Sequence, residues 1–427
     1  MSHPPDLGAS SPRPGTPAPG GPTPVISAEP IRVIAWRNAV FVIFTLSGLA
    51  LATWVARLPA VRDQLHLDTA MVGLLILGLS VGAVIGLVVA PHLLALLGPR
   101  GSILFCLFLV AAGLTGVGLV SAFVPVLALA MLCLAVFGFG NGMLDVLMNV
   151  EGAAAERANG RTLMPLMHAF FSFGTVIGAG LGALASLLNV PVSWNLGIIA
   201  VLIVVVGASI VRYLPKVVDV EDETTSAKTP IKQRIKDSLA VWADMRLLLI
   251  GLVLLGMAFA EGSANDWLAL ATVDGHHQDN TTGAIVFGVF VVAMTVGRIA
   301  GGPILDRFGR VPVIRWSALL GAIGLLMFIL SPVLWVAIIG TVLWGLGSSL
   351  GFPVGISAAA DDPQKAAARV SAVAIIGYCA FLAGPPLLGF LGQHFGILNA
   401  LFVVLILLIL AALAAPAARE RTGPFAR

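Results

Sequence analysis

The sequence is poor in charged residues and in cysteine, and each shortage excludes a class of protein. Charged residues make up only 11% of the 427 residues, whereas soluble domains carry about 25%. The three cysteines, Cys106, Cys133 and Cys379, all fall in apolar runs. They therefore form neither a disulfide framework nor a metal-ligand pattern. The net charge of +3 is small and no basic-aromatic motif occurs, so we expect no nucleic-acid partner.

Motifs that support catalysis or nucleotide binding are also absent. The chain has no phosphate-binding loop, no His-Glu-x-x-His and no Gly-x-Ser-x-Gly. We therefore predict that the protein is not an enzyme and that it carries no cofactor and no metal.

Apolar residues, in contrast, dominate the chain. Hydrophobic residues make up 58% of it, and the mean hydropathy is +1.01, values typical of a polytopic membrane protein. Apolar runs of about 20 residues predict twelve transmembrane spans. The predicted spans cover 39–58, 70–97, 102–122, 125–149, 164–188, 193–213, 245–268, 283–305, 313–331, 333–357, 370–391 and 397–416.

A polar segment between the sixth and seventh spans divides the chain into two parts. We predict a disordered tail rich in Pro and Gly, which lacks the apolar run of a cleaved signal peptide. Two six-helix halves, a linker and a short tail complete the all-α chain. The predicted ranges are 1–34 for the first tail, 35–213 and 245–417 for the halves, 214–244 for the linker and 418–427 for the second tail.

The loops differ in charge, which predicts the orientation. If the amino terminus is cytoplasmic, nearly all Lys and Arg lie on the cytoplasmic side, and the opposite side holds only Arg57 and Arg62. Short cytoplasmic loops are rich in Lys and Arg. We therefore expect both termini and the linker to be cytoplasmic.

The two halves share a glycine pattern. Gly86 and Gly98 in residues 85–99 match Gly297 and Gly309 in residues 296–310. Transporters built from parallel repeats bind substrate between the repeats. Further matched pairs are Gly138 with Gly345, Gly140 with Gly347, and Gly174 with Gly377.

On these features the sequence resembles the major facilitator superfamily over nearly all of 35–417. Gly302-x-x-x-Asp306-Arg307-x-Gly309-Arg310 is similar to the family's loop signature, whereas the first half has Ala95 in place of the acid. The resemblance implies the twelve-helix fold of that family, with two pseudo-symmetric halves that alternate access. It also implies a monomer in a bacterial inner membrane, with a small solute and protons as partners.

The fourth and fifth spans resemble the branch of fucose/proton symporters. The matching residues are Leu144-Asp145-x-x-x-Asn149 and the run 170–174, Phe-Phe-Ser-Phe-Gly. That branch also carries an acid in the first helix, where this chain has Thr53, Trp54 and Arg57.

Two acids inside the spans are candidates for proton coupling. Asp145 is spaced i, i+4 from Asn141 and Asn149, so the three share one helix face. An ionisable group in a span is costly unless it faces protein or water. Asp145, the only acid well inside the predicted spans of the first half, is therefore the first candidate. Glu261, which we place toward the outer end of the seventh span, is the second. A structural acid is the alternative in each case.

Other polar residues are candidates for the solute cavity and for gating. Helix packing is the alternative for most of them. The cavity candidates are Asn141, Asn149, Trp54, His168, Asn265, Trp344 and Ser348, and the gating candidates are Asp306, Arg307, Arg310 and Arg298. Arg298 is expected to pair near the cytoplasmic end.

The sequence thus predicts a proton-coupled secondary transporter of a small polar solute, with a sugar-like solute as one option. The alternative is a proton-driven exporter of a drug or metabolite. An intramembrane enzyme would need a nucleophile–base pair or a metal cluster. A channel is disfavoured by the two-half repeat.

Overall fold

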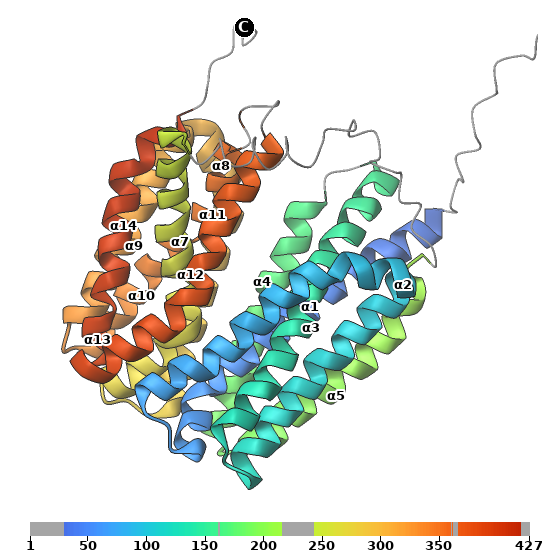
Figure 1. Cartoon of the computed structure of the whole chain (residues 1–427), viewed down its shortest axis with the longest axis horizontal. Helices are drawn as coiled ribbons and strands as arrows, with labels where there is room; N and C mark the ends of the chain where they lie inside the picture. Colours follow the sequence, from blue (N-terminus) through green and yellow to red (C-terminus); the bar gives the residue numbers. More distant parts are fainter. Residues whose placement is uncertain (1–29, 161–162, 216–242, 360, 362–365, 420–427) are drawn as a thin grey trace, which may run out of the picture.

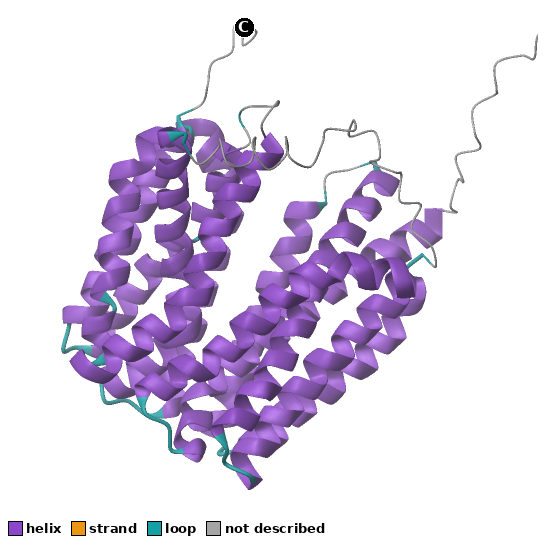
Figure 2. Cartoon of the chain, viewed as in Figure 1, coloured by secondary structure: helices purple, strands orange, loops and turns teal. Residues whose placement is uncertain are grey.

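The computed structural model describes residues 30–160, 163–215, 243–359, 361 and 366–419. Within these residues the protein is all-helical (Figure 2), which confirms the predicted class. Residues 1–29 and 420–427, which fall in the predicted tails, and most of the predicted linker lie outside the described residues.

The helices of the first half pack around α1. They are α1 (Pro30–Leu65), α2 (Thr69–Phe123), α3 (Leu127–Asn159), α4 (Met164–Leu187) and α5 (Val192–Ile210), followed by η1 (Val211–Tyr213). The second half contains α7 (Met245–Leu270), η2 (Ala271–Gly275), α8 (Asn280–Phe308), α9 (Arg310–Leu330), α10 (Leu334–Ser348), α11 (Gly351–Ala359), α12 (Ala366–Phe395), α13 (Ile397–Ala400), α14 (Phe402–Ala414) and η3 (Ala415–Ala418).

Eleven helical segments of the described chain are long and apolar enough to cross a membrane, close to the predicted twelve. The difference lies in α2, whose 55 residues contain two predicted spans. A straight helix of that length would extend about 80 Å, against about 30 Å for the hydrocarbon core. Gly98, with φ 64° and ψ 178°, interrupts the helical backbone between the two spans. The α2 segment is therefore long enough to cross the membrane twice, once on each side of Gly98.

Two helices are longer than the sequence predicted. The α1 helix begins at Pro30, so the predicted tail overlaps it over residues 30–34; proline suits a first helical turn. The α3 helix continues to Asn159, ten residues past the predicted end of that span, because polar residues can continue a helix beyond its apolar run.

The repeat predicted from the glycines has a structural counterpart. Gly98 and Gly309 have nearly the same backbone angles, φ 64° and ψ 178° against φ 75° and ψ 169°. Residues other than glycine rarely adopt such a positive φ. Gly138 and Gly345 also have equivalent surroundings: a Cβ would lie 2.0 Å from a carbonyl oxygen of α2 at the first and 2.6 Å from one of α8 at the second. Each half therefore packs its second and fourth crossings closely.

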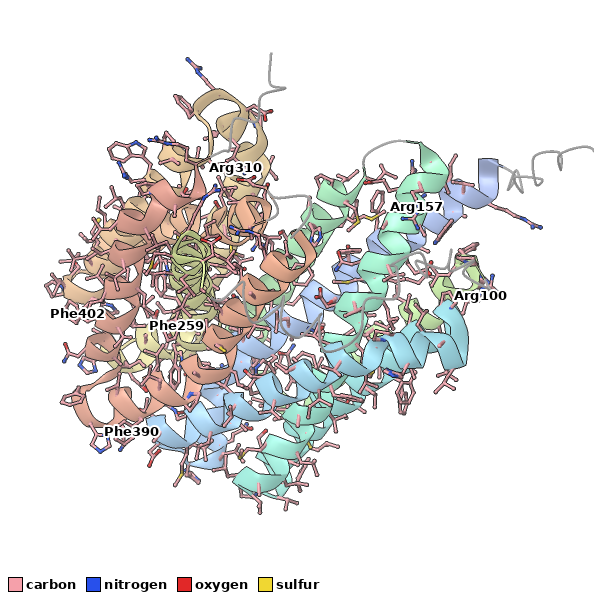
Figure 3. All side chains as sticks on the ribbon, turned by 45° about the horizontal axis from the view of Figure 1, so that its top comes forward. Arg100, Arg157, Phe259, Arg310, Phe390 and Phe402 are labelled. Atoms are coloured by element: carbon pink, nitrogen blue, oxygen red, sulfur yellow. The ribbon has the colours of Figure 1, made fainter. Side chains whose placement is uncertain are left out.

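The two halves meet at one end of the molecule. We call this the Leu65 end, where α1 finishes, and the other the Pro30 end, where α1 begins. In Figure 1 the ribbons of the halves diverge toward the Pro30 end, drawn at the top. In Figure 3 the molecule is turned so that the Pro30 end comes forward. Arg100 and Arg157 are labelled on the first half and Arg310 on the second.

Hydrogen bonds between the halves lie at the Leu65 end in the part of the chain that the structure describes. Arg62 donates to Asp274 at 2.6 Å, and the backbone N–H of Thr69 donates to the side chain of Gln393 at 3.0 Å. Two more bonds join Asn280 to Asp63 at 3.0 Å and Thr281 to Ser186 at 3.1 Å. The structure is thus an arrangement that is closed at the Leu65 end.

Candidate functional site

A row of polar side chains follows one face of α3. Asn141, Asp145 and Asn149 lie on this face because α3 is continuous through all three. The Ser47 hydroxyl of α1 donates to Oδ1 of Asn141 at 3.0 Å. The Asn149 amide donates to the Asp145 backbone oxygen at 2.8 Å, and Oδ1 of Asp145 lies 3.4 Å away. Asp145 is partly buried and pairs with no Lys, Arg or His among the described residues.

An ion pair joins α7 to α8 in the second half. Arg298 donates to Glu261 at 2.6 Å, and their side chains are 29% and 17% exposed. The expectation that Arg298 pairs near the end of the span is therefore wrong. Asp145, Glu261 and Arg298 each lie about 24 to 27 Å along their helices, given a rise of about 1.5 Å per residue. Glu261 is thus near mid-depth and not toward one end, because α7 and η2 continue to Gly275.

His168 lies on α4, which packs against α8 of the second half. It is exposed on α4, and the edge of its ring contacts Phe44 with the centroids 5.3 Å apart. The helix that carries it, α4, packs against α8, which carries Arg298. His168 and Arg298 therefore lie on two helices that pack against each other at the seam between the halves.

The remaining cavity candidates differ in location. Asn265 is partly buried one turn after Glu261 on α7, and Trp54 is buried in α1. Trp344 is fully buried, with its ring 5.5 Å from that of Phe290 and 6.1 Å from that of Phe328.

Trp344 and Ser348 therefore belong to the interior of the second half, between α8, α9 and α10. Ser348 is only 1% exposed, and its hydroxyl has no partner among the described residues. In this arrangement the Trp344 ring contacts α8 and α9 of its own half, and Ser348 follows one turn later on α10.

The gating candidates lie at the Pro30 end of α8 and α9. Asp306 and Arg307 are exposed, and the Arg307 guanidinium lies 5.4 Å from the centroid of the Phe308 ring. Asp306 has no hydrogen bond or ion pair with another described residue. Arg310 donates to Asp361 at 2.5 Å and to Ser357 at 3.0 Å. These hydrogen bonds of the motif lie within the second half.

Two further acids lie within the helices, and sequence reasoning missed the buried one of them. Glu151 on α3 is 1% exposed, so Asp145 is not the only acid inside the first half. It was missed because the predicted span ended at residue 149. Asp266, which falls in the predicted seventh span, lies within α7. It lies near Ser263 of α7 and Phe381 of α12 at a narrow gap between the two helices.

The described residues contain no group of three or more His, Cys, Asp or Glu side chains that could hold a metal ion. What the site offers is a set of amides, one partly buried carboxyl and one ion pair. Such groups bind hydroxyl, amine or carbonyl groups of a polar solute, and a carboxyl without a cationic partner readily takes up a proton.

Comparisons with known proteins agree with this architecture. Residues 40–277 and 264–426 match the model of the Major Facilitator Superfamily. An uncharacterized transporter, y4wD, of Sinorhizobium fredii is 30% identical over 388 residues, which cover 90% of this chain and 98% of that protein. Membrane protein MosC of Rhizobium meliloti is 26% identical over 86% of each chain.

Solved structures share the fold at low identity. A variant of the nucleoside transporter NupG superposes with a TM-score of 0.73 at 15% identity and covers 91% of this chain and all of its own. The transporter FucP in its outward conformation superposes with a TM-score of 0.61 at 17% identity, with 91% of this chain and all of FucP covered.

Proposed function

Because the chain belongs to the major facilitator superfamily and is a multi-pass membrane transporter, we propose that it moves a small polar solute together with protons. The two halves alternate between an arrangement closed at the Leu65 end and one closed at the Pro30 end. The observation that carries the proposal is the partly buried Asp145 at mid-depth, which has the Asn149 amide beside it and no cationic partner among the described residues.

The difference between the two acids assigns them different roles. Among the described residues, the side chain of Asp145 has a hydrogen bond only with the amide of Asn149. Enclosing Asp145 as a carboxylate is therefore costly, whereas a protonated carboxyl avoids this cost. Glu261 has its charge compensated by Arg298 at 2.6 Å. Asp145 is therefore the coupling group, and the Glu261–Arg298 pair contributes charged hydrogen-bonding groups to the solute site.

Coupling requires that the proton favour one arrangement over the other. Protonated Asp145 permits the halves to enclose the site without burying a charge. When the site opens again, water reaches the carboxyl and the proton leaves. The bonds at the Leu65 end, led by Arg62–Asp274, hold the other side shut in the present arrangement.

The charge distribution supports a cytoplasmic Pro30 end in a bacterial inner membrane. Basic residues are concentrated there, as expected for the cytoplasmic side. Those described at the Pro30 end are Arg32, Arg37, Arg100, Arg157, Arg212, Arg246, Arg307, Arg310, Arg315, Arg369 and Arg419, whereas Arg57 and Arg62 lie toward the Leu65 end. On this orientation the present arrangement is the inward-facing one.

The solute class rests on the polar groups of the site and on one related fold. Amide, carboxyl and guanidinium groups suit a solute with several hydroxyl or amide groups. NupG, which shares the fold, is a nucleoside transporter. Monosaccharides and nucleosides are therefore the first probes to screen.

The test uses purified protein reconstituted in vesicles. Monosaccharides and nucleosides are first screened for those that raise the melting temperature of the protein. The uptake of each such compound, in radiolabelled form, is then measured under an imposed pH gradient. Accumulation that collapses with a protonophore supports the proposal. Uptake that proceeds at the same level without a pH gradient would overturn the proton coupling.

A further inference from the structure

A second carboxyl on α3 lies deep inside the first half and has no place in the proposed coupling step. Glu151 is 1% exposed. Its Oε2 accepts a hydrogen bond from the indole Nε1 of Trp36 on α1 at 3.0 Å. Its Oε1 is buried and has no hydrogen-bond partner in the described part of the chain. One neutral donor therefore serves the whole carboxyl group.

The neighbouring packing is apolar and tight. At Gly152, the next residue of α3, an added Cβ would lie 2.8 Å from the sulfur of Met167 and 2.9 Å from that of Met164. The ring of Phe44 would be 3.7 Å away. Thioether and aromatic groups of α4 and α1 thus close over α3 at this level, and they offer Glu151 no compensating charge.

Charged groups on the packed helices also leave Glu151 without an ion pair. Arg37 of α1 donates to Asn38, and Arg100 of α2 donates to the backbone oxygen of Leu214. The titratable residues on this part of the helices packed around Glu151 are Arg32 and Arg37 of α1, His92 and Arg100 of α2, His168 of α4, and Glu156 and Arg157 of α3 itself. None of them forms an ion pair or hydrogen bond with Glu151 in the described chain.

An ionised carboxylate in this setting would be a buried charge with a single neutral donor, which is strongly unfavourable. We propose that Glu151 is a proton-binding site, distinct from Asp145. In the present arrangement its carboxyl holds a proton on Oε1, while Oε2 is the carbonyl oxygen that accepts the Trp36 N–H. The proton comes from solvent, and it returns there when α1 and α3 move apart and water reaches the carboxyl.

The site links protonation to the contact between α1 and α3 near the Pro30 end. Glu151 lies about 9 Å along the helix axis from Asp145, toward that end. The inference does not depend on which solute is carried or on whether Asp145 couples its transport.

Infrared difference spectroscopy of the full chain in vesicles tests the proposal, because a protonated carboxyl has a carbonyl stretch separate from the amide bands. Glu151→Gln should remove one such band from the spectrum of the parent protein at neutral pH. Gln retains an oxygen that accepts the Trp36 N–H, so the fold is preserved. Asp145→Asn is the matched control and should leave the Glu151 band in place.

Trp36→Phe provides an independent readout that keeps the acid. Loss of the indole donor should shift the same carbonyl band to higher frequency, because a hydrogen bond to a carbonyl oxygen lowers its stretching frequency. A carboxyl band that neither disappears in Glu151→Gln nor shifts in Trp36→Phe would show that Glu151 is ionised and would overturn the proposal. If Glu151→Gln does not fold, the shift in Trp36→Phe decides alone.

Discussion

Arg62 of α1 donates a hydrogen bond to Asp274 of η2 at 2.6 Å, and this ion pair joins the first half of the chain to the second. Arg62 also bonds Asp63 at 2.7 Å, and Asp63 in turn accepts from Asn280 of α8. These contacts form a short network across the Leu65 end. Any arrangement that opens this end must break it.

Arg62→Ala should shift the protein toward the arrangement open at the Leu65 end. The two side chains are 17% and 29% exposed, so the pair is worth about 1 kcal/mol or less, and the ratio of the two populations should change by up to about fivefold. Spin labels on each half at that end would measure the change by pulsed electron resonance. The charge swap Arg62→Asp with Asp274→Arg is the control, and it should restore the parent distribution. Identical distance distributions in parent and Arg62→Ala would remove this pair from the gate.

Asp145→Asn should separate binding from coupling. The amide mimics the protonated acid, so we expect solute exchange to continue and accumulation driven by a pH gradient to be lost. Both are measured in the same vesicles. Glu261→Gln is the comparison variant, since the charge of Glu261 is paired with Arg298. Accumulation by Asp145→Asn at the parent level would exclude Asp145 as the coupling residue.

Arg298→Ala should lower the melting temperature because it leaves the Glu261 carboxylate without its partner at mid-depth. Pairs in direct contact show interaction energies of about 0.5–3 kcal/mol, and the partial exposure of both side chains places this pair toward the lower values. The double variant with Glu261→Gln should recover part of the loss. Strictly additive effects in this double-mutant cycle would mean that the ion pair makes no contribution.

Single cysteines should report the orientation. Ala158 near the end of α3 and Val124 between α2 and α3 are both exposed and lie at opposite ends. With the three native cysteines replaced, an impermeant thiol reagent applied to intact cells should label Val124→Cys and not Ala158→Cys. The reverse pattern would place the Pro30 end outside.

Asp244 should give the protein a stability that is lost in acid. Burial opposes its ionisation, but hydrogen bonds from the Arg369 guanidinium and from the backbone N–H groups of Leu247 and Arg246 outweigh burial and lower its pKa. The ionised form thus stabilises the fold above the ordinary Asp pKa of about 3.9, and this contribution disappears as pH falls through the lowered value.

Asp244→Asn should therefore lower the melting temperature at neutral pH, and the difference from the parent should shrink as the solution is acidified. Asn is itself a good N-cap, so the substitution isolates the pair with Arg369. Arg369→Gln should follow the same pH dependence. A difference that stays constant from neutral to acidic pH would contradict this account.

Local patterns in the sequence were sufficient to predict most of the helices and part of the candidate site. In a bilayer every backbone polar group must be satisfied within the segment, so long apolar runs form helices whatever their neighbours are. Gly98 marks the break in α2 because few other residues accept its positive φ. Asn141, Asp145 and Asn149 share a face by helical periodicity alone.

Contacts between residues far apart in the sequence could be identified only from the tertiary structure. Glu261 meets Arg298 and Glu151 meets Trp36 across separations of 37 and 115 residues, and no local pattern encodes such contacts. The same holds for Trp344, whose apolar surroundings come from α8 and α9. Hydropathy places a residue at a depth in the membrane, whereas the packing of helices against one another decides which face is buried and which charge finds a partner.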